Sequence, residues 1–270
     1  MATVQTLTLQ TERMQASVED GIGWMVFNNP ARHNALSLEM WEGIGDILEH
    51  FADNEDVRVV IMRGAGGKAF VSGADISEFD KERANAEQRE SYGITAGRAT
   101  QWLAKIEKPL IGLIEGYCIG GGLATALSAD VRFATPDSRF GIPAAKLGLG
   151  DEYEGLAKLA RLVGPSRARD IMFSARFMPA REALDMGLIN FIEERDDIEG
   201  ACVSYAKTIA ENAPLTVKAA KAAINAWERG SRTEEVNAVR AMVDACFDSE
   251  DYREGRKAFA AKRKPEFKNR

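Results

Sequence analysis

Three consecutive glycines, Gly120, Gly121 and Gly122, constrain the fold of this chain more than any other feature of its sequence. They stand within GYCIGGGLATALSAD, residues 116–130, between an apolar run and a segment of helix-forming residues. Glycine destabilises regular structure by about 0.5–1 kcal/mol relative to alanine. Three in a row therefore indicate a place where the backbone turns sharply or where another group approaches it closely.

Three uses of such a turn differ in their chemistry. A tight strand-to-helix connection needs only the glycines. A nucleotide site needs a G-x-G-x-x-G frame, which this stretch lacks, or G-x-x-x-x-G-K-[ST], which the chain lacks throughout. An oxyanion site uses the unpaired N–H groups and partial positive charge of a helix start. A second N–H would complete it, and Ala74, which follows Gly73 in KAFVSGADISEF, could supply one.

Composition limits the class of protein. The chain has 270 residues, 45% of them hydrophobic, and a formal net charge of -6, which argues against a nucleic-acid partner. Cys118, Cys202 and Cys246 form no CxxC pair, and His33 and His50 are the only histidines, so neither a disulfide framework nor a metal site is indicated. The first residues lack secretory features, and no apolar run approaches the ~18 residues of a membrane span. We expect a cytoplasmic protein with no membrane partner.

Strand and helix patterns alternate over the first two thirds of the chain. Two strands surround a turn at Glu19-Asp20-Gly21, and buried-strand patterns recur in VRVVIMRG and PLIGLIEG. Helix-forming residues run from about 81 to 107, and from about 198 the pattern is helical nearly to the end. The alternation predicts an α/β fold. We expect one unit over residues 1–197 and a helical region over 198–270.

Several motifs occur in an order that resembles a known family. They are NNPARHNALS (residues 28–37), GKAFVSGADI (67–76), EGYCIGGGLATALSADVRFA (115–134) and FGIPAAKLGLG (140–150), followed by LVGPSRARDIMFSARFMPAREALDMGLIN and EGRKAFAAKRKPEFK. Together they resemble the crotonase, or enoyl-CoA hydratase/isomerase, family over residues 14–268. The resemblance implies a spiral of ββα units, a C-terminal helical trimerisation region and a homotrimer or dimer of trimers.

The resemblance also implies a substrate and residues that bind it. The substrate is an acyl-CoA thioester, so coenzyme A arrives with the substrate and no cofactor is covalently bound. The carbonyl oxygen of the thioester would lie between the backbone N–H groups of Ala74 and Gly121. The residues implied in substrate binding are His33, Gly73, Ile76, Gly120, Phe259 and Lys262. Phe259 and Lys262 would approach coenzyme A across a subunit boundary.

The sequence departs from the family's pattern at the acids. Hydratases of the family use two glutamates, and the matching positions here are Ala124 and Ala144, neither of which can transfer a proton. The cluster LGLGDEYEG offers other carboxylates, and other family members carry a catalytic aspartate at the position of Glu152. Glu152 is therefore our candidate base, with Asp151 and Glu154 as neighbouring alternatives. The competing interpretation is that these acids cap a helix beginning near Gly155.

These observations predict an enzyme that stabilises a thioester enolate. Hydration of an enoyl-CoA is favoured, followed by enoyl- or dienoyl-CoA isomerisation and then by hydrolysis of an acyl-CoA. A different class of function, a catalytically silent acyl-CoA-binding protein, would have kept the oxyanion hole and lost the acids. The motifs do not specify the acyl group.

Overall fold

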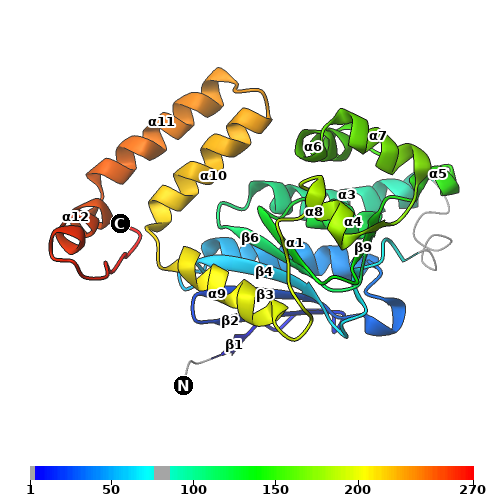
Figure 1. Ribbon diagram of the computed structural model, residues 1–270, viewed down its shortest axis with the longest axis horizontal. Coiled ribbons are helices and arrows are strands. Elements are labelled where there is room, and N and C mark those ends of the chain that lie inside the picture. The colour runs from blue at the N-terminus through cyan, green and yellow to red at the C-terminus, as the bar shows by residue number, and fades with distance from the viewer. Residues whose placement is uncertain (1–3, 76–85) are drawn as a thin grey trace.

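Two β-sheets form the centre of the molecule in the computed structural model, which describes residues 4–75 and 86–270 (Figure 1). The larger sheet has seven strands in the order β1-β2-β3-β4-β6-β8-β11. They are β1 (Gln5–Thr6), β2 (Met14–Glu19), β3 (Ile22–Phe27), β4 (Val59–Gly64), β6 (Leu110–Ile114), β8 (Val131–Ala134) and β11 (Phe191–Ile192). β2 and β3 pair antiparallel around the predicted turn, and from β3 to β11 the strands are parallel.

The smaller sheet has four strands in the order β10-β9-β7-β5. They are β5 (Ala69–Val71), β7 (Tyr117–Ile119), β9 (Arg139–Gly141) and β10 (Met178–Pro179). Consecutive strands alternate between the sheets, because β4, β6 and β8 belong to the larger one and β5, β7 and β9 to the smaller one. The chain thus passes from the larger to the smaller sheet three times, and the turn after β7 comes close to the turns after β5 and β9.

Helices cover both sheets and extend beyond them. They are η1 (Pro30–Arg32), α1 (Leu38–Asp53), α3 (Ala86–Lys105), α4 (Gly121–Ala126), α5 (Ala144–Leu147), α6 (Tyr153–Val163), α7 (Pro165–Ser174), α8 (Ala180–Asp185), α9 (Ile198–Ala210), α10 (Pro214–Glu228), α11 (Thr233–Asp248) and α12 (Glu250–Ala260). None of the described helices is both long and apolar enough to span a membrane. The helix predicted from about residue 81 is described from Ala86, and residues 76–85 lie outside the described part.

Burial follows the strand patterns. All five residues of β6 are buried, as expected for a parallel strand covered on both faces. One apolar core joins α1 and α3 to the sheets and includes Phe27, Phe51, Phe70 and Phe140. A second lies between the larger sheet and α9, which contributes Ile198, Cys202 and Ala206.

The last three helices, α10 to α12, form an arm that extends from the two sheets (Figure 1). α10 and α11 run antiparallel, and α12 lies at the far end of the arm. α9, by contrast, packs on the larger sheet. The predicted boundary between two units at residue 198 stays a prediction. It would place α9 in a different unit from the larger sheet, although α9 shares an apolar core with that sheet.

Candidate functional site

The three glycines of the turn between β7 and α4 serve three separate needs. Gly120 has φ +54° and ψ -119°, a conformation that L side chains rarely adopt, and its N–H donates to the carbonyl of Gly141 at 2.8 Å. At Gly122 an added Cβ would lie 2.0 Å from the carbonyl oxygen of Val71. α4 can therefore approach β5 this closely only without a side chain. Gly121 has neither a positive φ nor a close neighbour that would exclude a side chain, so its role must lie elsewhere.

The second predicted donor, Ala74, follows β5 and pairs with Leu36 in an isolated parallel bridge. The N–H of Leu36 donates to the carbonyl of Gly73 at 2.8 Å, and the N–H of Asp75 donates to the carbonyl of Leu36 at 2.9 Å. In a parallel bridge of this kind the N–H of the central residue points away from the partner strand. The N–H of Ala74 therefore faces away from Leu36.

Ala74 and Gly121 come together in space although 46 residues separate them in the sequence. A Cβ built at Gly121 would lie 3.8 Å from the amide nitrogen of Ala74, and one built at Gly120 would lie 3.9 Å from Cα of Gly73. Neither the N–H of Ala74 nor that of Gly121 has an acceptor within residues 4–75 and 86–270. Gly121 is also the first residue of α4, where the helix dipole is positive. Two unpaired donors beside each other can hold one negatively charged oxygen.

The close approach of α4 to β5, which requires glycine at position 122, can be tested by substitution. Gly122→Ala should lower the free energy of unfolding by about 1–3 kcal/mol or more, because the methyl group would collide with the backbone of Val71. Urea denaturation monitored by circular dichroism measures the change. Gly97→Ala is the matched control, since a Cβ there meets nothing within 4 Å. Equal stability of the two variants would contradict the close packing of α4 on β5.

Neither α4, which carries Ala124, nor α5, which carries Ala144, contains a carboxylate that could replace the expected acid. Ala124 is exposed on α4, and Ala144 is the buried first residue of α5. Asp130, the first charged residue after the glycines, is structural: its carboxylate accepts from the N–H of Leu110 at 2.7 Å and pairs with Lys221 at 2.8 Å. It fixes the start of β6 to α10.

The acidic cluster lies at the start of α6. Asp151, Glu152 and Glu154 are all exposed, and none of their carboxylates makes a hydrogen bond or ion pair to the described part of the chain; the backbone carbonyl of Glu152 accepts from the N–H of Leu156 at 3.3 Å. Desolvation raises the pKa of the Asp151 carboxyl above its usual range even though the side chain remains exposed. α6 begins at Tyr153, two residues earlier than expected, and Glu152 occupies the N-cap position, where its side chain accepts no hydrogen bond. The predicted capping bond is therefore absent, and the three carboxylates are free to bind other groups.

The remaining predicted binding residues fall in three places. Gly73 and Gly120 lie beside the two donors. His33 is exposed with φ 50°, its carbonyl accepts from the N–H of Ser72 at 3.1 Å, and its ring lies 6.2 Å from that of Tyr117, measured between centroids. The predicted residue Ile76 lies outside the described residues.

Phe259 and Lys262 are not near the two donors of their own chain. Phe259 is 89% exposed near the end of α12, and Lys262 follows that helix with φ 52°. Both belong to the far end of the arm in Figure 1, away from α4. The structure thus brings together Gly73, Ala74, Gly120 and Gly121, and it separates Phe259 and Lys262 from them within one chain.

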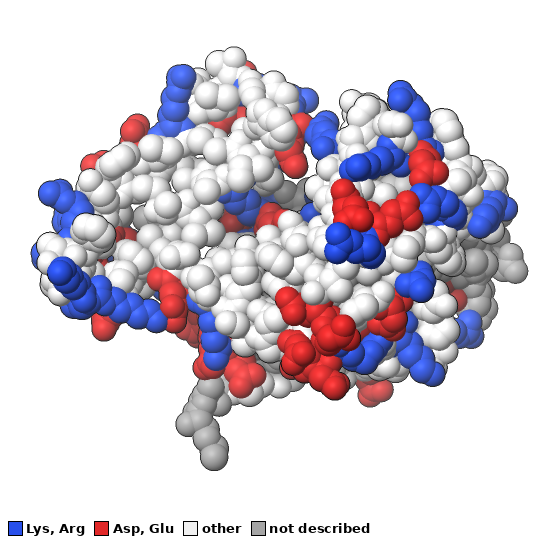
Figure 2. Space-filling model, in the orientation of Figure 1, with Lys and Arg blue, Asp and Glu red and all other residues white. Residues whose placement is uncertain are grey.

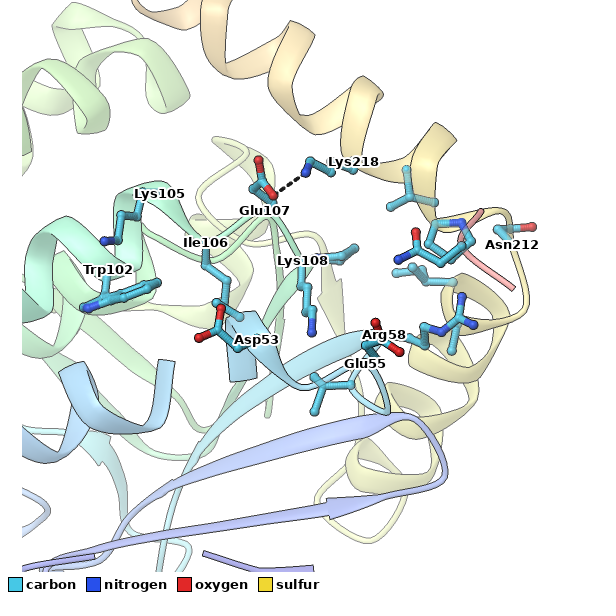
Figure 3. Close-up of a pocket in the computed structure, with 18 residues that line it drawn as sticks. Asp53, Glu55, Arg58, Trp102, Lys105, Ile106, Glu107, Lys108, Asn212 and Lys218 are labelled. Atoms are coloured by element: carbon cyan, nitrogen blue, oxygen red, sulfur yellow. Dashed lines mark ion pairs between the residues drawn. The ribbon is translucent and has the colours of Figure 1, made fainter. Parts of the chain in front are cut away.

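A separate cavity of about 580 Å³ lies where α1, α3 and α9 end, beside the start of α10 (Figure 3). It contains none of the predicted site residues. Burial lowers the pKa of Lys108 to about 8, but its ammonium donates to the carbonyls of Phe51 at 2.5 Å and Asn54 at 2.6 Å, which favours the charged form. Lys218 pairs with Glu107 at 2.5 Å. Lys108 and Lys218 therefore already have partners in the folded chain.

Comparison with known proteins identifies relatives along almost the whole chain. The profile of the enoyl-CoA hydratase/isomerase family matches residues 17–270. A short-chain-enoyl-CoA hydratase of Clostridium acetobutylicum is 36% identical over 93% of this chain and 96% of its own. A crotonyl-CoA hydratase of Syntrophomonas wolfei is 32% identical over 92% and 95%.

A solved structure shares the fold. The crystal structure of an enoyl-CoA hydratase/carnithine racemase from Magnetospirillum magneticum has a TM-score of 0.89 and 38% identity, covering 97% of each chain. The predicted α/β fold of the crotonase type is therefore confirmed. The stoichiometry expected of its C-terminal region stays a prediction.

Proposed function

The chain belongs to the enoyl-CoA hydratase/isomerase family, a family of enzymes, and on that premise we propose that it adds water to an enoyl-CoA thioester. The observation that carries the proposal is the pair of unpaired N–H groups of Ala74 and Gly121, which lie side by side at the start of α4. The names of two relatives, a short-chain-enoyl-CoA hydratase and a crotonyl-CoA hydratase, favour a short acyl group.

In the proposed reaction the two N–H groups donate to the carbonyl oxygen of the thioester. The oxygen of water bonds to the β-carbon, and the π electrons of the double bond move toward the carbonyl, so that an enolate forms. Negative charge then develops on the oxygen that the two donors and the positive end of α4 already face. A proton bonds to the α-carbon as the carbonyl re-forms. The donors are thus most effective at the enolate, as catalysis requires.

A carboxylate must accept a proton from water and return one to the α-carbon. Ala124 and Ala144 cannot do so, and we propose Glu152 for this role. Its side chain has no partner in the described structure and lies at the start of α6. A general base of this kind typically contributes about 10²–10⁴-fold to the rate.

A protein that only binds acyl-CoA is the second candidate, favoured by the two alanines at the acid positions and by the exposure of the acidic cluster. Enoyl-CoA isomerisation and thioester hydrolysis are variants of the enzymatic proposal. All of them use the same oxyanion site, so the products must distinguish them.

The experiment is incubation with a panel of coenzyme A thioesters in D₂O, followed by mass spectrometry. The panel contains short, long, branched and aromatic 2-enoyl groups. Hydration adds D₂O to the thioester, isomerisation exchanges hydrogen without adding oxygen, and hydrolysis releases a free acid. We expect addition of D₂O to a short 2-enoyl-CoA. Binding without any of these changes would reject enzymatic function in favour of the silent binder.

We also propose that the protein assembles as a homotrimer or a dimer of trimers. Figure 2 shows a broad uncharged area over the arm. Large apolar side chains exposed on the arm are Ile224, Trp227, Val243, Phe247, Tyr252 and Phe259. A monomer rarely leaves so much apolar surface in water. The arm also lines an apolar groove of about 650 Å³ that includes Phe247 and Phe259.

Sedimentation equilibrium at micromolar concentration tests the assembly. The expected mass is three or six times the 29.6 kDa of one chain. Phe247→Asp, which places a charge on the exposed apolar face, should shift the protein toward smaller species. A wild-type monomer would contradict both the assembly and the approach of Phe259 and Lys262 to coenzyme A bound by a neighbour.

We also propose a cytoplasmic location for the protein. Its three cysteines are free, which supports this proposal.

A further inference from the structure

A cavity of about 300 Å³ lies between α3, α6 and α10, at the end of α4 opposite the glycines. Leu127 and Ser128, which directly follow α4, line it on one side. This volume corresponds to about ten water molecules at about 30 Å³ each. It is too small for a coenzyme A thioester and large enough for a small ion with its hydration water.

Lys158 brings a positive charge into this cavity from α6. Its side chain is half-buried, and within residues 4–75 and 86–270 its ammonium has neither a hydrogen-bond acceptor nor an ion-pair partner. Burial lowers the pKa of this ammonium; the charge of Glu228 opposes that effect, and the charge of Arg132 adds to it. A half-buried cation without a partner is costly, which favours a bound anion.

Arg132 brings a second positive charge from β8. It is 3% exposed, and its guanidinium is held by backbone carbonyls alone: Nε donates to Leu188 at 2.7 Å, and Nη1 donates to Ala126 and Ala129. Nη2 has no acceptor in the described part of the chain, and no carboxylate there pairs with Arg132. One nitrogen thus remains able to donate to a ligand.

The carboxylates of the cavity do not balance these charges. Asp130 already accepts from Leu110 and pairs with Lys221 at 2.8 Å, so these two charges cancel. Glu228 lines the cavity from α10 and makes no ion pair with any described residue. Two cations, Lys158 and Arg132, then share a single free carboxylate.

We propose that this cavity binds a small oxyanion, phosphate or a short carboxylate, between Lys158 and Arg132. Ser128 and Asn225 line the cavity as well and offer neutral hydrogen-bond donors. Because Lys158 belongs to α6 and Asn225 to α10, the anion would join the arm to the rest of the molecule. The charge of Glu228 acts on both cations and would oppose an anion, and the two cations outweigh that single carboxylate.

The test is binding of sodium phosphate, followed by acetate and malonate, to the whole protein. Isothermal titration calorimetry gives the affinity, and thermal unfolding gives the rise in Tm at constant ionic strength set with sodium chloride. A ligand that binds only the folded state raises Tm in a saturable manner. We expect such a rise with phosphate or with a carboxylate, and the ion that causes it identifies the source of the oxyanion.

Variants assign the effect to the cavity. Lys158→Met should weaken binding at least tenfold and, in chloride alone, should raise Tm because it removes the unpaired charge. Lys257→Met removes an exposed lysine of α12 and should leave both measurements unchanged. Lys158→Gln replaces the methionine variant if that one does not fold. No saturable binding to the wild type, or equal binding to the Lys158 variant, would overturn the proposal.

Discussion

Replacing Gly121 with proline should lower kcat by about 10²–10³-fold and change thioester affinity much less. Proline removes one of the two N–H groups that face the developing charge, and loss of one such donor typically costs about 2.7–4 kcal/mol of transition-state stabilisation. The measurement is steady-state kinetics with the best 2-enoyl-CoA of the panel. Since the donor acts mainly on the enolate, the loss should occur in kcat and not in KM.

The position of Gly121 makes this variant compatible with folding. It is the first residue of α4, where proline is well tolerated, and a Cβ there has no described neighbour closer than 3.8 Å. Circular dichroism should therefore show a folded protein, in contrast to Gly122→Ala, which should lose stability. A folded Gly121→Pro variant with undiminished turnover would remove Gly121 from the mechanism.

Glu152→Gln should lower turnover by about 10²–10⁴-fold while coenzyme A affinity stays nearly constant. Glutamine keeps the size and the hydrogen-bonding capacity of the side chain but cannot transfer the proton. If Glu152 only stabilises the start of α6, the same change should cost at most about 1 kcal/mol of stability and leave the rate intact. Kinetics and urea denaturation of the same variant separate the two roles.

The neighbouring acids provide matched controls. Asp151→Asn and Glu154→Gln remove similar charges from the same exposed segment. If Asp151→Asn alone abolishes turnover, the base is one residue earlier, where desolvation already raises the pKa of the carboxyl. Full activity in all three variants would show that this cluster is structural and that the proton comes from elsewhere.

Much of the fold follows from local sequence. Glu19-Asp20-Gly21 predicts a hairpin, because Asp-Gly is typical of two-residue hairpin turns. In the structure Asp20 and Gly21 both adopt the positive φ that such a turn requires, at 51° and 80°. The apolar run of β6 predicts a strand buried on both faces. The glycines alone gave the oxyanion site as one of three uses, and the resemblance was needed to choose it, because nothing local to Gly73 indicates that it lies beside Gly120.

Other features depend on contacts that spacing does not reveal. The need for glycine at position 122 comes from the carbonyl of Val71, which is 51 residues away in the sequence. Amphipathic patterns predict that α10 to α12 are helices. They do not predict that these helices extend from the core as an arm, because periodicity identifies the apolar face of a helix and not the surface against which it packs. Lys158 and Arg132 likewise give no signal in the sequence, because only the folded chain shows that both line one cavity and that neither pairs with a described carboxylate.

The central claim is that Ala74 and Gly121 stabilise a thioester enolate, and exchange at the α-carbon tests it most directly. A saturated acyl-CoA, such as butyryl-CoA, is incubated in D₂O with the wild type and with Gly121→Pro, and deuterium at the α-carbon is measured by mass spectrometry. We predict that the wild type incorporates deuterium and that the variant does so at least 10²-fold more slowly. Absence of exchange in the wild type, or equal exchange in both proteins, would contradict the claim.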